Sequence, residues 1–406
     1  MPAGNARVLI VGAGPVGVVC ALALHRRGVA VTVCEQEPAP VRDQRAASIH
    51  PPTLELLDDL GVTRKIIPRG HVSPTYRFHD RVSNAVVAEF DLARMSDEFR
   101  FPFVLQYEQY KLTASIAAEY ANGGDFDVRF FHAVTGLTQQ VDHVDVEIAS
   151  PSGSERLAAS YVIGCDGGRS TVRKLAGIDF EGFTYPEKFI KIATTFDFAE
   201  VNSNLVYRNY FSDPDEWCNL VKVRGESPGG LWRAIFPLRH DEDDAEALAP
   251  DKIEARLQKF LPKAGRYYVE YVNVYPVSQC VAATMRSGRV LLAGDAAHVN
   301  NPIGGMGMNG GIHDAVNLAD KLARVIHGEA GEDLLDLYSR QRRYAAVKYI
   351  QQQTIANKRL MEERDPAVRA KNFDELRRIA DDAHSARKYM RRAALLDSLN
   401  EANAVA

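Results

Sequence analysis

The fold of this chain is decided by the stretch Arg7-Val-Leu-Ile-Val-Gly12-Ala-Gly14-Pro-Val-Gly17. A short apolar run ends at its first glycine, residues 15–27 have helical periodicity, and residues 29–34 form a second apolar run. A strand, a glycine turn, a helix and a second strand within about thirty residues are typical of a βαβ unit. The pattern therefore predicts a parallel sheet in an α/β fold.

The three glycines of this turn suit a dinucleotide. Gly12 permits the tight turn, Gly14 lets backbone approach a pyrophosphate, and Gly17 allows close packing of helix on strand. The helix N-terminus adds a partial positive charge that favours phosphate. Glu35 ends the second strand, and its carboxylate suits the two hydroxyls of an unphosphorylated ribose. The sequence thus predicts a dinucleotide site without separating FAD from NAD.

The composition is that of a globular protein. The 406 residues carry 49 Lys and Arg against 53 Asp and Glu, a net charge of −4, and 46% of them are hydrophobic. This balance offers no basic surface for nucleic acid or an anionic membrane. We expect no signal peptide or membrane span, because no long apolar run occurs. The five cysteines have neither disulfide nor zinc spacing, so we expect a cytoplasmic protein without a metal site.

The rest of the chain is interpreted as four parts. Residues 1–182 are predicted to be the first part of the dinucleotide-binding domain, 183–280 an antiparallel-sheet substrate domain, 281–345 the second part of the dinucleotide-binding domain, and 346–406 a helical segment. Residues 351–400 contain 11 Lys and Arg and 8 Asp and Glu. Mixed charge at this density indicates a solvated helical face, with a homodimer contact as the alternative.

Local patterns predict further elements inside these parts. Alternating apolar and polar residues favour antiparallel hairpins within Tyr76–Phe90 and Val128–Ile148. Helical periodicity marks Tyr107–Tyr120 and Gly311–Ile326. The glycine-rich stretch before the second of these helices is expected to lie outside it.

Two later strand ends each carry a glycine and a carboxylate, in Val162-Ile-Gly-Cys-Asp166 and in Val290-Leu-Leu-Ala-Gly294-Asp295. Ligands of open α/β sheets bind at the carboxyl ends of parallel strands. A flavin's ribityl chain needs a second clamp of this kind, whereas a nicotinamide does not. The two strand ends therefore favour FAD over NAD.

A glycine-rich stretch follows, Pro302-Ile-Gly-Gly-Met-Gly-Met-Asn-Gly-Gly311. Its glycines allow backbone to lie against a flat ring, and the helix expected to begin near Gly311 would direct its positive end at that ring. This field suits the negative charge of a reduced flavin. A mobile loop is the alternative interpretation.

Together, three motifs resemble the single-component FAD-dependent aromatic hydroxylases, the class A flavoprotein monooxygenases of the p-hydroxybenzoate hydroxylase fold. The motifs are Gly-x-Gly-x-x-Gly (12–17), Cys-Asp-Gly-x-x-Ser-x-Val-Arg (165–173) and Gly-Asp-Ala-Ala-His-x-x-x-Pro-x-Gly-Gly-x-Gly-x-Asn (294–309). The resemblance extends from Val8 to about Arg343. It implies a Rossmann-like FAD-binding domain with a parallel sheet, an antiparallel-sheet substrate domain and C-terminal helices.

The resemblance also implies an activity. NAD(P)H would reduce FAD, and a flavin C4a-hydroperoxide would transfer one atom of O2 to an electron-rich, phenol-like aromatic or heteroaromatic ring. A general base near the ring would help, because a phenolate is attacked more easily than a phenol.

Cofactor roles follow from the resemblance residue by residue. The ADP half of FAD would be held by Gly12, Gly14, Gly17 and Glu35. Asp166 would be chiefly structural, with a role in NAD(P)H binding as an alternative. The remaining FAD contacts would come from Arg45, Gln106 and Asp295, and from Pro302, Gly304, Gly305, Gly307, Met308 and Asn309 at the isoalloxazine.

Substrate contacts are expected on the second domain, above the flavin. Tyr210 is the candidate for a proton relay and Arg233 for pairing with a carboxylate. His50 and Pro302 complete the catalytic set. The other polar and aromatic residues of this region are more often core than ligand, namely Tyr207, Trp217, Asn219, Trp232 and Phe236. His298 is expected to be structural.

Other functions remain open from the sequence. A flavin-dependent halogenase would carry W-x-W-x-I-P, which falls on residues 232–237 without the second Trp and the Ile. A flavin-bearing redox sensor without turnover lacks support from a cysteine pair or an appended domain. An NAD-dependent dehydrogenase leaves residues 294–311 without a role. The identity of the aromatic substrate and the choice of NADH or NADPH stay undecided.

Overall fold

The computed structural model describes residues 7–42, 45–121, 124–239 and 241–406. Its first sheet has six strands, and all but the edge strand β18 run parallel, as predicted from the opening βαβ unit. Their order is β18 (Arg286–Ser287), β19 (Val290–Leu292), β12 (Tyr161–Gly164), β1 (Arg7–Val11), β2 (Ala30–Cys34) and β8 (Phe126–Arg129).

Helix α1 (Pro15–His25) packs between this sheet and α8 (Met306–Ile326). Nine consecutive residues of α1, from Val16 to Leu24, are buried, which explains why it is apolar on all sides. A small antiparallel sheet of β9 (Ala133–Gln139), β10 (Val144–Ser150) and β11 (Gly153–Ala159), with α5 (Thr171–Leu175), adds to the same core. This shared core fixes the position of the carboxyl ends of the parallel strands.

The predicted hairpin within Val128–Ile148 is wrong at its start. Val128 belongs to β8, which pairs parallel with β2, and the antiparallel strands begin only at Ala133. A buried parallel strand and a hairpin strand have similar short apolar patterns, so periodicity alone did not separate them.

The second sheet has eight strands and is mainly antiparallel. The hairpin of β5 and β6 joins it through a parallel pairing of β5 with β14, which places Phe78 opposite Tyr210. Segments of the chain near residues 80 and 210 therefore lie side by side. The strand order is β20 (His298–Val299), β17 (Val269–Ala282), β13 (Phe180–Thr194), β16 (Leu231–Leu238), β15 (Cys218–Val223), β14 (Arg208–Ser212), β5 (Thr75–Asp80) and β6 (Ala85–Asp91).

One face of this sheet is covered by the helices α6 (Asp244–Ala247) and α7 (Pro250–Phe260), with η4 (Phe198–Glu200) beside them. A third small sheet and several short helices complete the fold. The strands of the small sheet are, in order, β3 (Ser48–Ile49), β7 (Val104–Gln106) and β4 (His71–Ser73), and the helices are α2 (Pro51–Asp59), α3 (Thr63–Ile66), α4 (Gln109–Tyr120), η2 (Ile67–Arg69) and η3 (Leu92–Met95). Of these helices, α2, α3 and α4 pack into the core of the first sheet and η3 into the core of β5 and β6.

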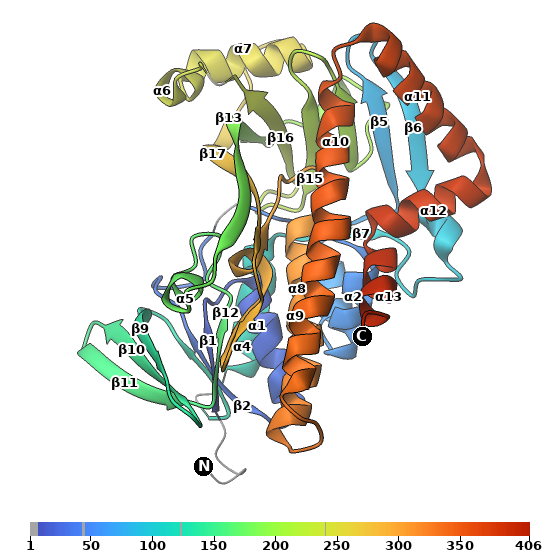
Figure 1. The fold of residues 1–406 in the computed structure, drawn as a ribbon. Helices are drawn as coiled ribbons and strands as arrows, with labels where there is room; N and C mark the ends of the chain where they lie inside the picture. The colour runs from blue at the N-terminus through green and yellow to red at the C-terminus, as the bar shows by residue number, and fades with distance from the viewer. Residues whose placement is uncertain (1–6, 43–44, 122–123, 240) are drawn as a thin grey trace.

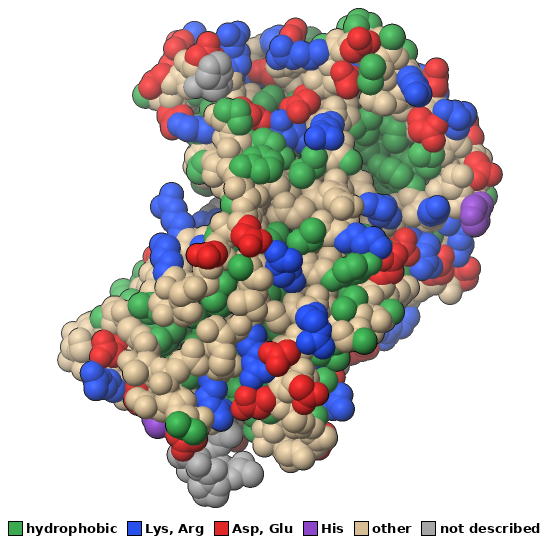
Figure 2. Space-filling view, in the orientation of Figure 1, with side chains coloured by type: hydrophobic (Ala, Val, Ile, Leu, Met, Phe, Trp, Pro, Cys, Tyr) green, Lys and Arg blue, Asp and Glu red, His purple; other side chains and the backbone are tan. Residues whose placement is uncertain are grey.

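The C-terminal segment is helical, as expected. Helix α9 (Asp333–Ala345) continues through a π-helical turn (Ala346–Gln351) into α10 (Gln352–Glu362), so that one long rod runs from the first sheet to the second (Figure 1). Three helices follow it, α11 (Pro366–Asp381), α12 (Ala383–Ala393) and α13 (Leu396–Asn403). Acidic and basic side chains are mixed over this face (Figure 2). The inner faces are apolar, because Met361, Phe373 and Met390 are buried in one hydrophobic core with residues of β5 and β6.

Helix α8 begins at Met306, earlier than predicted. Most of the glycine-rich stretch is thus helical, and only Gly304 and Gly305 have positive φ, at 107° and 68°. Glycine lowers helix propensity, but here the absence of side chains permits close packing. A Cβ at Gly311 would lie 2.6 Å from Cγ2 of Val16 and 2.9 Å from Cα of Gly294. Across the described residues, no helix is long and apolar enough to cross a membrane.

Candidate active site

The glycine turn between β1 and α1 combines two roles. Gly12 has a φ of 101°, and a Cβ there would lie 2.6 Å from the carbonyl oxygen of Cys165. A Cβ at Gly17 would collide with the carbonyl oxygen of Gly12. Gly14 differs, because a Cβ on it would meet no atom within 4 Å. Gly12 and Gly17 are therefore required by packing, whereas the space beside Gly14 is open at the N-terminus of α1, where a phosphate binds favourably.

Glu35 is held in place at the end of β2. Its Oε2 accepts a hydrogen bond from the backbone N–H of Ala13 at 2.8 Å, and its Oε1 accepts one from that of Glu37 at 3.0 Å. A carboxylate oxygen has more than one lone pair, so both oxygens can still accept hydrogen bonds from ribose hydroxyls.

Asp295 lies at the end of β19, beside Gly294. Its side chain is exposed, yet the surrounding protein raises its pKa by desolvation, with His298 and Arg45 acting in the opposite direction. An exposed carboxylate that is nevertheless crowded by protein lies in a concave part of the surface. The structure thus brings Arg45 and Asp295 together, as expected for two contacts of one cofactor.

Gln106 lies in β7 and is fully buried. Its Oε1 accepts a hydrogen bond from the Ser48 hydroxyl at 2.9 Å, while its Nε2 has no hydrogen-bond partner among the described residues. Buried amide donors are almost always satisfied in folded proteins. The free donor of Gln106 therefore fits a ligand oxygen, such as one on a ribityl chain.

Two predicted cofactor residues are occupied by backbone contacts. Asn309 donates to the carbonyls of Ser48 and Gly305 at 2.8 and 2.7 Å and accepts from the His50 N–H at 2.9 Å. Asp166 accepts from the Ser170 hydroxyl and from two backbone amides at the start of α5. Asn309 thus ties the start of α8 to β3, and Asp166 caps α5.

A buried charge network holds α8 against the end of β19. Asp314 accepts hydrogen bonds from Arg342 Nε at 2.6 Å and from the backbone N–H of Gly294 at 3.1 Å, and its Oδ2 is 2.7 Å from His298 Nε2. Desolvation acts to raise the pKa of Asp314, but His298 and Arg342 outweigh it, so the pKa is lowered. The network gives His298 a structural role and fixes the strand end that carries Asp295.

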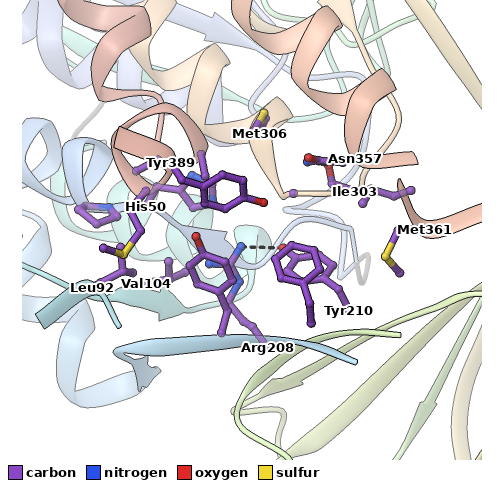
Figure 3. Close-up of a pocket in the computed structure, with 17 residues that line it drawn as sticks. His50, Leu92, Val104, Arg208, Tyr210, Ile303, Met306, Asn357, Met361 and Tyr389 are labelled. Atoms are coloured by element: carbon purple, nitrogen blue, oxygen red, sulfur yellow. Dashed lines mark hydrogen bonds between the residues drawn. The ribbon is translucent and has the colours of Figure 1, made fainter. Parts of the chain in front are cut away.

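A pocket of about 520 Å³ of empty volume, part of it open to solvent, lies between strands β5 and β14 of the second sheet, the glycine-rich segment and the C-terminal helices (Figure 3). Tyr210 and His50 line it, whereas Pro302 and Arg233 do not. The lining is His50, Pro51, Tyr76, Phe78, Leu92, Val104, Arg208, Tyr210, Ile303, Gly304, Met306, Asn357, Met361, Tyr389, Met390, Ala393 and Ala394.

The charged group of this pocket is Arg208. Its side chain comes from β14 and donates from Nη2 to the Tyr210 hydroxyl at 2.9 Å, the contact dashed in Figure 3. The guanidinium also lies 5.3 Å from the ring centroid of Tyr76 and 5.9 Å from that of Tyr210. Burying a charge costs several kcal/mol, whereas cation–π contacts return only about 0.5–2 kcal/mol each. The residue is only 6% exposed, so these contacts leave its charge incompletely compensated.

His50 lines the same pocket as Arg208 and lies next to Gly304. Burial lowers its pKa well below the usual value, and the charge of Arg208 acts in the same direction, so the imidazole is neutral at pH 7. The buried hydroxyl of Tyr76 has no hydrogen-bond partner among the described residues, and the ring of His50 has only the nearby backbone of Gly304. Unpartnered polar atoms in one apolar cavity indicate a ligand with polar groups of its own.

Arg233 is buried in β16 and contacts the segment that precedes β3. Its Nη1 donates to the carbonyl oxygen of Arg45 at 3.2 Å. The side chain therefore supports the segment that carries one of the expected FAD contacts. Trp217, Trp232 and Phe236 belong to the cores of the second sheet, as core residues were expected to do.

The sequence analysis missed several of the lining residues. Arg208 is two positions from Tyr210 on one strand, and the strand period of two places both on the same face. This signal was available from the sequence. Asn357, Tyr389 and Met390 come from the C-terminal helices, whose charge-rich composition gave no indication of a pocket wall.

Comparisons with known proteins agree with this geometry. A family model described as an FAD binding domain matches residues 5–353. The chain is 34% identical over 368 residues to para-nitrophenol 4-monooxygenase of a Pseudomonas species, which covers 90% of this chain and 89% of the relative.

Solved structures give the same result. The crystal structure of p-nitrophenol 4-monooxygenase from Pseudomonas putida has a TM-score of 0.90 at 32% identity, covering 98% of this chain and 99% of that chain. A ternary complex of aklavinone-11 hydroxylase with FAD and aklavinone has a TM-score of 0.77 at 26% identity, covering 89% of this chain and 70% of that chain.

Proposed function

We propose that this chain, which belongs to the family of FAD-dependent aromatic monooxygenases, hydroxylates a small phenol-like ring in the pocket of Arg208 and Tyr210. One observation carries the proposal: Ile303, Gly304 and Met306 line the pocket and belong to the glycine-rich segment expected at the isoalloxazine. A ring in the pocket therefore lies directly against the expected flavin position. The relatives support this function over a halogenase or a redox sensor.

The residues present fit FAD. The open space beside Gly14 suits the pyrophosphate, the two anchored oxygens of Glu35 suit a ribose, and the free amide donor of Gln106 suits the ribityl chain. Asp295 and Arg45 would complete the contacts. When bound, FAD would supply the acceptance of hydride from a nicotinamide and the activation of O2.

The side chains of the pocket orient the substrate and control its protons. Tyr210 accepts a hydrogen bond from Arg208, so its own hydroxyl proton is free to be donated to a substrate oxygen. Neutral His50 offers a second polar contact in the same pocket. The remaining lining is largely apolar, and an apolar lining disfavours water beside a reactive oxygen species.

Three further parts of the proposal rest on the sequence and the family. NAD(P)H would be the reductant and would bind transiently. A cytoplasmic location is supported by five cysteines that are all free. A homodimer stays a prediction for the outer face of the C-terminal helices.

The test uses isotopically labelled O2 with 4-nitrophenol as the first substrate, because the relatives of this chain include enzymes named for it. We expect NAD(P)H oxidation stimulated by the phenol and one heavy oxygen atom in the product. Label that enters only from water, or incorporation of chloride, would show that the proposed function is wrong.

A further inference from the structure

The turn at residues 303–305 is held by two asparagine side chains from different helices. Asn309 of α8 donates to the carbonyl oxygen of Gly305 at 2.7 Å, and Asn357 of α10 donates from Nδ2 to the carbonyl oxygen of Ile303 at 3.1 Å. Asn309 belongs to the last cofactor motif, whereas Asn357 lies outside the residues that the FAD-binding family model matches. The second tether is therefore a feature of this chain that the cofactor motifs do not include.

A chain of hydrogen bonds fixes the orientation of the Asn357 amide. Its Oδ1 accepts a hydrogen bond from Gln353 Nε2 at 2.9 Å, and Gln353 Oε1 accepts one from Nε of Arg392 in α12 at 2.8 Å. A guanidinium can only donate, so the oxygen of Gln353 must face Arg392 and its nitrogen must face Asn357. The nitrogen of Asn357 is thereby left to face the carbonyl of Ile303. Arg392 thus sets the direction of every bond in the chain.

The tether also determines where the next backbone N–H points. In a trans peptide the C=O and the N–H point in opposite directions, so holding the Ile303 carbonyl towards α10 turns the N–H of Gly304 away from it. No acceptor among the described residues bonds this N–H. The fit is close, because Gly304 has a φ of 107° and a Cβ there would lie 2.7 Å from Nδ2 of Asn357. The turn therefore presents a free donor in the segment expected at the isoalloxazine.

We propose that Asn357 is a positioning residue for the flavin: by holding the Ile303 carbonyl, it directs the Gly304 N–H at the cofactor and favours reduced over oxidised FAD. A backbone N–H aimed at developing negative charge stabilises that charge. Asn357 acts through the turn, although its side chain also lines the pocket (Figure 3). The role rests on the proposed function in taking the isoalloxazine to lie at this turn, but it is measured without turnover.

The test measures the two-electron reduction potential of the FAD-loaded protein, without an aromatic compound, by equilibration with reference dyes. Asn357→Leu keeps the approximate size of the side chain and removes both of its hydrogen bonds. We expect reduced FAD to lose about tenfold in affinity relative to oxidised FAD, which lowers the potential by about 30 mV. Gln352→Leu is the matched control, a similar change at an exposed position of the same helix, and should keep the wild-type potential.

A second variant tests the chain of hydrogen bonds without altering the pocket. Gln353 does not line the pocket, and Gln353→Leu frees the Asn357 amide to rotate. The potential should fall in the same direction but by less. The double variant Asn357→Leu/Gln353→Leu should match Asn357→Leu alone, because the two side chains act in series. Gln353→Leu decides the matter even if Asn357→Leu binds no FAD.

Direct contact of Asn357 with the substrate would give a different pattern. Asn357→Leu would then weaken binding of 4-nitrophenol, measured by isothermal titration calorimetry, while the potential of the ligand-free protein stayed that of the wild type. This result would overturn the positioning role, as would a wild-type potential in Gln353→Leu or an equal shift in Gln352→Leu. None of these measurements depends on turnover, so a failure to hydroxylate any probe would count against the proposed function alone.

Discussion

Gly14 is a position where the expected ligand, rather than the protein itself, leaves no room for a side chain. Its φ of −68° and ψ of 178° are ordinary extended values, and a Cβ there meets nothing within 4 Å. The neighbouring glycines of the motif differ, because a side chain on either would strike backbone. The structure therefore allows cofactor binding and folding to be separated at a single position.

We predict that Gly14→Val folds normally but binds FAD at least about tenfold more weakly, equivalent to about 1.4 kcal/mol, because its side chain fills the space for the pyrophosphate. Flavin content and fluorescence titration of apoprotein would measure the loss. Gly229→Val is the control, since Gly229 also has an open environment but lies in an exposed turn of the second sheet. Equal flavin affinity in the two variants would contradict the assignment.

His79 makes stability depend on pH. It is buried against Phe211, with ring centroids 4.2 Å apart, and burial lowers its pKa to about 4. The unfolded chain takes up this proton near pH 6.5, so its stabilising contribution is complete above that pH and is lost as pH falls towards 4. A shift of this size corresponds to about 3 kcal/mol.

Urea denaturation between about pH 4 and pH 7 should therefore show the free energy of unfolding falling with acidity, and less steeply in His79→Gln than in the wild type. His313 has its pKa lowered to about 3 and contributes in the same direction, so the variant removes only part of the slope. His384→Gln, at an exposed position of α12, should keep the wild-type slope. An unchanged slope in His79→Gln would contradict the prediction.

At the scale of elements, α8 is anchored through Asp314. We predict that Asp314→Asn lowers the free energy of unfolding by about 3–5 kcal/mol, because it leaves the buried charge of Arg342 without its partner. FAD binding should weaken as well, since Gly294 and Asp295 lose their tether. The measurement is urea denaturation of the apoprotein, followed by flavin titration.

Asp320→Asn provides a control on the same helix. Asp320 is half-exposed and lies 3.5 Å from Arg27. Exposed pairs contribute about 0–1 kcal/mol, so this variant should remain close to the wild type. Similar losses in both variants would mean that the buried network does not anchor α8.

The limits of sequence-based prediction are clearest in α8 and β8. The βαβ unit, the strand ends at Asp166 and Asp295 and the parallel sheet were predictable, because local patterns determine them. The start of α8 could not be predicted from the sequence. The glycines give residues 302–311 a low helix propensity, which suggested that they lie outside the helix, but close packing of Gly311 on Val16 stabilises a helix there. The pairing of β8 depends equally on a neighbour far along the chain.

At the scale of the whole molecule, the pocket is assembled from four separated regions of the chain, near residues 50, 76–104, 208–210 and 303–394. The motifs located the flavin side of the site. They did not locate the far wall, because Tyr389 and Met390 take part only through the docking of α12, for which a sequence offers no local signal. The sequence did identify Tyr210 as a pocket residue, because its pattern predicted that this tyrosine lies on a strand of the second sheet.

Ion pairs dock α12 beside the pocket. Arg387 forms hydrogen bonds with Asp97 at 2.9 Å, and both Arg387 and Arg391 pair with Glu98. We predict that the double variant Arg387→Gln/Arg391→Gln loses about 1–2 kcal/mol of stability and releases more hydrogen peroxide per NAD(P)H consumed, because the wall between these arginines loosens. FAD affinity should not change.

The comparison variant is Arg377→Gln/Arg378→Gln, which removes two exposed pairs within α11 itself. It should keep the wild-type ratio of product to peroxide. If the two double variants release the same amount of peroxide, the docking of α12 does not control access of water to the pocket.

The far wall of the pocket lies outside all three cofactor motifs. Met361, Tyr389, Met390 and Ala393 line the pocket, whereas the last cofactor motif ends at Asn309. A duplicated gene for such a protein can therefore accumulate substitutions in α10 and α12 and change the ring that is accepted, while the redox machinery is inherited intact. Laboratory evolution towards new aromatic compounds has its natural starting library at these four positions.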